Sequence, residues 1–316
     1  MENFTSALGS ATLIFTYEVD DVTRAVFLVI SFLCFTFFFY FIAIMLKVFF
    51  TTPHMQEDPR YVFFVHMLIN DTLYIVFTNF LVVSYMHSVY FPIILCFIIN
   101  TLTGCMFLVT PYNLALMSLE RYIAICFPLR RLQFCTPKRA KYAILVVWVI
   151  GLSLCLVSFI ISLSLADRTL YSLYVLCDDS PMLSISPILG QLGNFINIFS
   201  FSGVALIIVF SYINVMLVAR KIGSGSSSAL KAGKTMMLHA FQLLLCMVAF
   251  MSNLSDVYVN NYLYLLIVTN YMLFTCVPRF LSPLIYGVRD EAFRKHIRKN
   301  CSITCHNCPQ SGLEKL

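Results

Sequence analysis

The sequence has little charge for its length: 11% of its 316 residues are charged, whereas 60% are hydrophobic. A water-soluble protein of this size exposes far more charge, because long charged side chains supply most of its wetted surface. The scarcity therefore excludes an ordinary soluble protein and points to membrane lipid as the solvent. A formal net charge of +6 is compatible with nucleic-acid binding, but the basic residues lie at the ends of apolar runs, so we expect no nucleic-acid partner.

Sequence signatures of enzymes, carriers and secreted proteins are also missing. There is no nucleotide-binding loop, no nucleophile and base in a recognisable context, and no histidine cluster with metal-ligand spacing, so we expect no enzyme, cofactor or metal. No inverted repeat of the transporter kind is visible. The amino terminus lacks the order of a cleavable signal peptide, so the first apolar run is expected to act as an uncleaved signal anchor.

Seven charge-poor runs are each long enough to cross a bilayer, since about 30 Å of hydrocarbon takes roughly 20 helical residues. The runs are 25–46, 61–86, 91–119, 142–166, 188–219, 235–255 and 262–286. Only Asp71 and Arg279 place a charge inside them. The sequence therefore predicts an all-α membrane protein, a single domain in which residues 24–287 form a seven-transmembrane helix bundle.

The basic residues favour one orientation of this bundle. They gather in alternate connecting segments and in the tail: Lys47, Arg60, Arg130, Arg131, Lys138, Arg139, Lys141, Arg220, Lys221, Lys231, Lys234, Arg289, Arg294, Lys295, Arg298 and Lys299. The other segments hold only Arg24 and Arg168. By the positive-inside rule, residues 1–23 are extracellular and residues 288–316 form a cytosolic tail of a multi-pass plasma-membrane protein. The sequon at Asn3 is a glycosylation site only in this orientation.

Two cysteines are expected at the outer end of the bundle. Cys96 precedes Arg121 by 25 residues, which is about 37 Å of helix, so the two lie at opposite membrane edges. Cys177 is the only cysteine of the long outer segment, which faces an oxidising compartment. We expect a Cys96–Cys177 disulfide that holds this segment across the bundle; the alternative is two unpaired thiols.

The inner end of the third run carries the most specific motif. Glu120, Arg121 and Tyr122 are followed by Ile-Ala-Ile-Cys-Phe-Pro-Leu. The triplet resembles the Asp/Glu-Arg-Tyr signature of rhodopsin-like G-protein-coupled receptors, and the longer string resembles the form found in olfactory receptors. The resemblance implies that the acid holds the arginine at rest and that the arginine contacts a heterotrimeric G protein once the bundle opens. A lone arginine here would fit an ordinary positive-inside residue, but the whole string does not.

Other segments carry the same resemblance over nearly the whole chain. Trp148 lies midway along the fourth run, Ser211 and Tyr212 resemble the olfactory Ser-Tyr pair, and the segment 231–239 resembles the entry to span six. Pro283 and Tyr286 resemble the Asn-Pro-x-x-Tyr element, with a basic amphipathic segment behind it. The resemblance is strongest to fish-type odorant receptors. It implies olfactory stimulatory G-protein coupling, a short cytosolic helix after span seven, and activation roles for Glu120, Arg121, Tyr122, Tyr212, Pro283 and Tyr286.

Asp71 and Arg279 are ionisable groups at membrane depth, where they are costly unless paired or functional. In related receptors the matching aspartate holds sodium with two asparagines, but the first run lacks one and Ser282 replaces the other. The chain also lacks the proline that the family usually has near Val204, and the run 235–255 has no proline. These differences further limit how much of the family's activation geometry applies to this chain. We expect a buried Asp71–Arg279 ion pair in place of sodium, because an unpaired buried charge is strongly unfavourable. The alternative is an arginine facing a water-filled cavity.

The resemblance implies a ligand pocket in the outer half of the bundle. Its candidate lining is apolar with a few hydroxyls and amides: Asn100, Thr103, Gly104, Phe107, Asn197, Ser200, Met247, Phe250, Met251, Leu254, Met272, Thr275 and Cys276. Thr103 stands where amine receptors place an aspartate, so the expected ligand is a small uncharged odorant. Any of these side chains can instead serve helix packing.

Three cysteines follow the basic tail segment. Cys301 and Cys305 are expected palmitoylation sites, with zinc binding by Cys305 and Cys308 or free thiols as alternatives. Two other functions compete with the receptor. A small-solute transporter or channel would use Asp71 and Arg279 as path residues. A light-driven retinal protein would need a lysine in the run 262–286, which has none.

Overall fold

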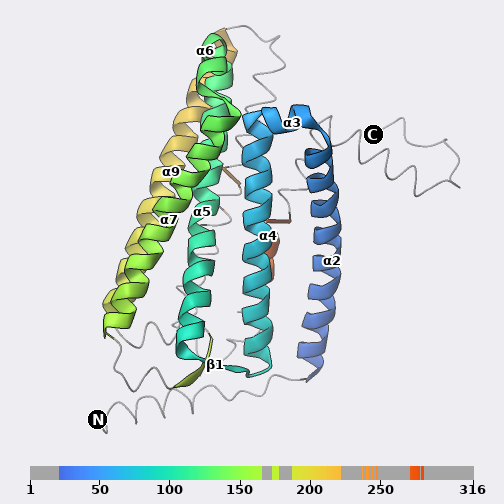
Figure 1. Cartoon of the computed structure of the whole chain (residues 1–316), viewed down its shortest axis with the longest axis vertical. Helices are drawn as coiled ribbons and strands as arrows, with labels where there is room; N and C mark the ends of the chain where they lie inside the picture. The colour runs from blue at the N-terminus through green and yellow to red at the C-terminus, as the bar shows by residue number, and fades with distance from the viewer. Residues whose placement is uncertain are drawn as a thin grey trace, which may run out of the picture.

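The computed structural model describes residues 21–165, 173–177 and 187–221, together with residues 237, 240–241, 244, 247, 271–277 and 279–280. Five long helices lie side by side as a bundle (Figure 1). They are α2 (Asp21–Thr51), α4 (Pro59–Met86), α5 (Ile93–Cys126), α7 (Pro137–Leu165) and α9 (Pro187–Lys221). Each contains a stretch long and apolar enough to cross a membrane, which confirms the first five predicted runs as helices.

The helices extend beyond the charge-free runs, because a charge at the membrane edge ends a run without ending the helix. The third run differs at its start, where Tyr90–Pro92 forms strand β1 and α5 begins only at Ile93. The sixth run lies mostly outside the described residues. Of the seventh run, Tyr271–Cys276 forms η2, a π-helix.

Prolines begin the two short helices that connect long helices, and also the long helix α4. Helix α3 (Pro53–Glu57), helix α6 (Pro128–Phe134) and helix α4 each have proline in the first turn, where its missing N–H is not needed. The residue before each proline is extended or irregular, which separates successive helices. Helices α3 and α6 lie at one end of the bundle and β1 at the other (Figure 1).

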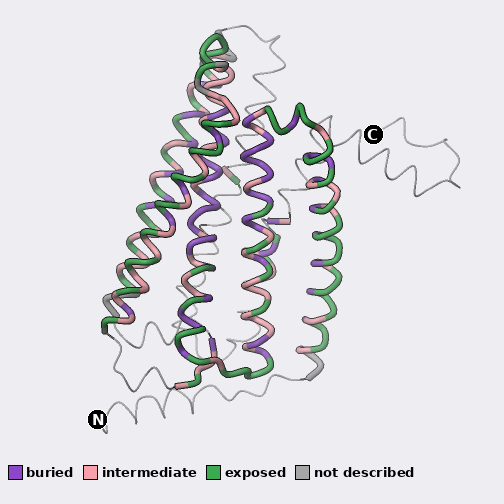
Figure 2. Tube along the Cα trace, in the orientation of Figure 1, coloured by how far each residue is buried: buried purple, intermediate pink, exposed green. Residues whose placement is uncertain are grey.

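The distribution of polarity is the reverse of that in a soluble protein. Large apolar side chains such as Phe32, Phe199 and Leu206 are 70% or more exposed, whereas Asn70 and Asp71 are buried. Buried positions concentrate on the facing sides of α4 and α5 (Figure 2). An apolar outside with polar groups inside is the arrangement that a surrounding bilayer stabilises.

Helix α5 is the centre of the described bundle, since α4, α7 and α9 all pack against it. Its approach to α7 is close at Gly151, where an added Cβ would meet Val109 Cγ2 at 3.3 Å and Cys105 Sγ at 3.4 Å. A larger side chain at this position would push the two helices apart. The central position of α5 brings its two ends, with Cys96 and Glu120, into contact with neighbouring elements.

Candidate functional site

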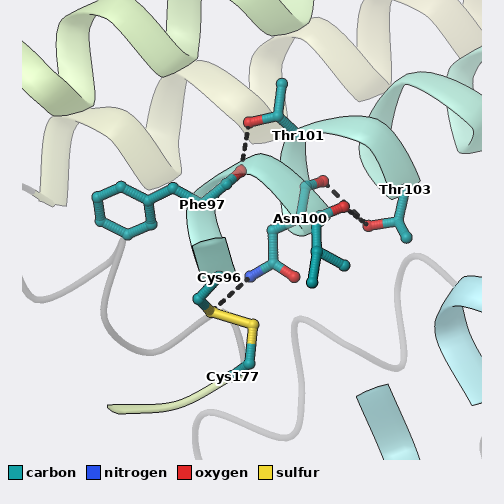
Figure 3. Close-up of a disulfide and its surroundings, with 7 residues drawn as sticks. Cys96, Phe97, Asn100, Thr101, Thr103 and Cys177 are labelled. Carbon is teal, nitrogen blue, oxygen red and sulfur yellow. Dashed lines mark hydrogen bonds between the residues drawn. A yellow bond between two sulfur atoms is a disulfide. The ribbon is translucent and has the colours of Figure 1, made fainter. Parts of the chain in front are cut away.

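One end of the bundle is closed by a disulfide. Cys96 in the first turn of α5 is bonded to Cys177, with the two Cα atoms 5.3 Å apart (Figure 3). Cys177 directly follows strand β2 (Tyr174–Leu176), which pairs antiparallel with β1. The predicted disulfide is therefore confirmed, and it holds β2 beside the start of α5.

The candidate ligand residues on α5 lie just beyond this disulfide. The Asn100 amide is directed at Cys96 Sγ, 3.8 Å away (Figure 3). The Thr103 hydroxyl has the carbonyls of Ile99 and Asn100 as acceptors at 3.1 and 3.0 Å, so its proton is engaged by its own helix. At Gly104 an added Cβ would meet no heavy atom within 4 Å, which marks open space beside this helix face.

Deeper in the bundle the candidate residues pack on other side chains. Phe107 lies 5.7 Å from Phe201 in an edge-to-face arrangement and 6.1 Å from Tyr74. The hydroxyl of Ser200 accepts a hydrogen bond from Tyr112 at 2.8 Å, which links α9 to α5. The structure thus gives Ser200 a helix-packing contact beside its predicted ligand role.

The remaining candidates are divided between described and undescribed parts of the chain. Asn197, Met247, Met272 and Thr275 are half-buried, and Cys276 is buried in the main core. Several of the site residues predicted from the sequence lie outside the described residues: Phe250, Met251, Leu254, Pro283, Tyr286, Asn3, Cys301 and Cys305.

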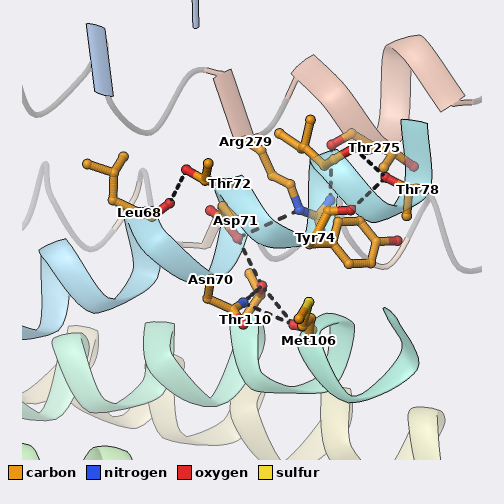
Figure 4. A network of polar contacts seen from close by, with 11 residues as sticks. Leu68, Asn70, Asp71, Thr72, Tyr74, Thr78, Met106, Thr110, Thr275 and Arg279 are labelled. Carbon is orange, nitrogen blue, oxygen red and sulfur yellow. Dashed lines mark hydrogen bonds and ion pairs between the residues drawn. The ribbon is translucent and has the colours of Figure 1, made fainter. Parts of the chain in front are cut away.

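The structure brings Asp71 of α4 and Arg279 together at the centre of the bundle. Arg279 Nε lies 3.6 Å from Asp71 Oδ1, and both side chains are 1% exposed. The Thr110 hydroxyl donates to the same carboxylate oxygen at 3.0 Å (Figure 4). Arg279 Nη1 donates to the Thr275 carbonyl at 3.0 Å, and its Cζ lies 3.9 Å over the ring of Tyr74. Each of the two charges is therefore balanced by the other inside the bundle.

At the end of the bundle opposite the disulfide, Glu120 and Arg121 form a second ion pair. Arg121 Nε lies 3.7 Å from Glu120 Oε2, and the Glu120 side chain is 3% exposed. Tyr122 packs against Phe127 and Phe210 at ring distances of 5.7 and 5.6 Å. Tyr212 packs in the same cluster on α9. These contacts join α5 and α9 at the end of the bundle opposite the disulfide.

Two more arginines extend this ion pair. Arg131 Nη2 in α6 lies 3.9 Å from Glu120 Oε1 and 3.6 Å from Asp58 Oδ1. Asp58 precedes α4, accepts from the Arg60 backbone N–H at 3.1 Å, and pairs with the Arg60 guanidinium at 3.1 Å. This link could not be predicted from the sequence, because Arg131 was only one of many basic residues in the segments expected to be cytosolic.

A third polar group, missed from the sequence, joins α4, α5 and α7. Trp148 Nε1 donates to His66 Nε2 at 2.7 Å, and His66 Nδ1 lies 3.3 Å from Asn113 Oδ1. The Asn113 amide donates to the Phe63 carbonyl at 3.1 Å. A histidine inside an apolar run was the available signal, since a polar group at this depth requires partners.

Comparison with known proteins places these features in a receptor family. A sequence model of the 7 transmembrane receptor (rhodopsin family) matches residues 42–286. The chain is 28% identical to odorant receptor 131-2 of Danio rerio over 242 residues, which cover 75% of this chain and 74% of that protein. It is 26% identical to olfactory receptor 52A1 of Homo sapiens over 203 residues, which cover 59% of this chain and 62% of that receptor.

Proposed function

Because this chain belongs to the rhodopsin family of seven-transmembrane receptors, we propose that it is an odorant receptor that binds a small uncharged odorant and activates a heterotrimeric G protein. It is a multi-pass membrane protein and not an enzyme. The transporter or channel alternative has no support, since its two path residues, Asp71 and Arg279, are paired with each other inside the bundle.

The observation that carries the proposal is the Glu120–Arg121 pair at the inner end of α5. The pair lies near the end of the same helix that the disulfide holds at its other end. The proposed ligand position and the proposed G-protein contact therefore share one helix. Binding must favour the open state over the closed state, because a ligand of equal affinity for both shifts nothing. In the open state Arg121 leaves Glu120 and meets the G protein.

The proposed odorant position is beside Gly104 and Phe107, in the outer half of the bundle. Open space next to Gly104 supports this position, and Phe107 connects it by ring contacts to α4 and α9. No carboxylate is among the candidate lining residues, so a cationic amine would lack a counter-ion. The proposed ligand is therefore neutral and largely apolar.

The orientation of the proposal follows the basic residues: the amino terminus is extracellular and the tail is cytosolic, at the plasma membrane. The G protein is of the olfactory stimulatory type, so the readout is cyclic AMP. Asn3 is the proposed glycosylation site, and Cys301 and Cys305, behind a short amphipathic helix, are the proposed palmitoylation sites.

Expressed receptor with a stimulatory Gα subunit, screened against a panel of single odorants, tests this function. An active odorant raises cyclic AMP in cells with wild-type receptor. Arg121→Ala abolishes the rise while antibody labelling of an extracellular tag shows unchanged surface expression. Arg130→Ala, which removes a nearby exposed charge, retains it. A response that survives Arg121→Ala, or labelling of residue 121 from outside the cell, contradicts the proposal.

A further inference from the structure

Arg131 lies between two carboxylates that come from different elements. Its Nη2 atom is 3.9 Å from Glu120 Oε1 on α5 and 3.6 Å from Asp58 Oδ1 ahead of α4. Arg131 itself belongs to the short helix α6, which follows α5 after one residue. One guanidinium therefore connects α6, α5 and the start of α4.

Glu120 has two cations at once. Arg121 Nε lies 3.7 Å from one carboxylate oxygen and Arg131 Nη2 lies 3.9 Å from the other. The carboxylate is almost fully buried, and a buried charge that loses its partner is strongly destabilising. If Arg121 were its only partner, releasing Arg121 to a G protein would leave the Glu120 carboxylate buried and unpaired.

We propose that Arg131 is a positioning residue that keeps Glu120 paired when Arg121 is released, and so lowers the free-energy cost of activation. The inference rests on the proposed function and concerns the same inner site. Arg131 stabilises the open state more than the closed state, because in the closed state Arg121 also neutralises Glu120. Such a differential contact is what shifts a two-state equilibrium.

Asp58 makes this second cation independent of Arg121. It contacts Arg131 at 3.6 Å and is itself fixed by the Arg60 guanidinium at 3.1 Å and by its cap on the α4 backbone. Besides its contact with Glu120, Arg131 is thus attached to the Asp58–Arg60 pair, which includes neither Arg121 nor any residue of α5. When Arg121 moves, the Asp58–Arg131 contact holds the guanidinium near Glu120.

The direction of the effect separates this role from that of a simple tether. If Arg131 only held the inner face closed, its removal would raise signalling without ligand. If it neutralises Glu120 in the open state, its removal lowers signalling. The loss is then reversed by removing the charge of Glu120, because a neutral glutamine needs no cation. This dependence on a second residue is a coupling that a double-mutant cycle measures.

The experiment compares cyclic AMP per surface receptor, without ligand and with the most active single odorant of a panel, in cells with a stimulatory Gα subunit. Arg131→Gln lowers both signals several-fold, while Arg131→Lys retains most of them. The matched control Arg130→Gln removes the same charge from an exposed position of the same helix and gives wild-type signals. In the Glu120→Gln background, Arg131→Gln has no effect on the cyclic AMP signal. This comparison of two variants still tests the inference where the single variant Arg131→Gln reaches the surface poorly.

Different outcomes overturn different statements. Wild-type receptor without any Arg121-dependent signal overturns the proposed function and this inference with it. A wild-type signal that Arg131→Gln raises, or leaves equal to Arg130→Gln, overturns this inference alone. So does a loss in Arg131→Gln that persists unchanged in the Glu120→Gln background.

Discussion

The guanidinium of Arg279 lies 3.9 Å over the ring of Tyr74, three residues after the aspartate with which it pairs. The arginine is therefore held by α4 twice, once through charge and once through an aromatic face. Tyr74 also contacts Phe107, 6.1 Å away on α5. Arg279 is thus two side-chain contacts from Phe107, a candidate odorant residue, and Asp71 is three.

Replacement of Tyr74 separates the ring from the hydroxyl. Tyr74→Phe keeps a ring under the guanidinium, whereas Tyr74→Leu keeps an apolar side chain but removes the cation–π contact. A desolvated contact of this kind contributes about 2 kcal/mol, so we expect Tyr74→Leu to lower the thermal midpoint of purified receptor clearly more than Tyr74→Phe does. Equal midpoints for the two variants would show that the ring face contributes nothing.

The Asp71–Arg279 pair predicts how substitutions at Arg279 differ. Removing one member of a buried pair costs about 3–5 kcal/mol, because the other charge stays buried. Arg279→Ala is therefore expected to reduce surface expression and signalling severely, and Arg279→Lys much less. Since the wild-type site already contains its cation, odorant potency in sodium chloride and in potassium chloride should be the same. A sodium-dependent potency would contradict the internal cation.

The disulfide predicts a stability loss that depends on both cysteines. Removing such a bond typically costs about 2–5 kcal/mol, so Cys96→Ser and Cys177→Ser should each lower the thermal midpoint, and the double variant should fall no further. Cys34→Ser, at a half-buried free cysteine, is the matched control. Reducing agent should lower the midpoint of the wild type but not that of the double variant; a drop in both would assign the effect to other residues.

Leu129 is 92% exposed in α6, at the end of the bundle that carries Arg121. Its side chain has nearly no packing to lose, so Leu129→Ala should change the free energy of unfolding by no more than about 0.5 kcal/mol and leave the thermal midpoint close to that of the wild type. We expect the same variant to reduce odorant-evoked cyclic AMP, because an apolar side chain so exposed beside the proposed coupling site is available to the G protein. Full signalling by Leu129→Ala would remove Leu129 from that contact.

The sequence predicted what depends on composition along the chain and missed what depends on folding across it. Charge-poor runs marked the five described spans, since a bilayer disfavours charge in each segment separately. The disulfide followed from two cysteines, Cys96 and Cys177, that were both expected to face the same oxidising compartment. Arg131 and Asp58, by contrast, meet only because a proline begins α6 and turns the chain back toward α4. No local pattern contains that geometry.

Buried polar groups show the same division. Asp71 and Arg279 stood out as lone charges in apolar runs, so each required a partner. Tyr74 did not stand out and Trp148 stood out only as a match to the family, because aromatic residues are ordinary in such runs and only the fold shows what their polar or π faces contact. Ser200 was selected as a ligand contact from its hydroxyl, yet the structure shows that this hydroxyl bonds Tyr112 on α5.

The His66 group yields the last prediction. Because Trp148 Nε1 donates to His66 Nε2, the ring is neutral and its proton is on Nδ1, which donates to Asn113. Trp148→Phe keeps an aromatic ring but removes the donor, which leaves a partly buried acceptor unpaired and costs about 1–3 kcal/mol. Purified Trp148→Phe should therefore unfold at a lower temperature than the wild type. Combined with His66→Leu, which removes the acceptor, Trp148→Phe should cost little more; a full additional loss would show that the tryptophan stabilises the bundle by packing and not through His66.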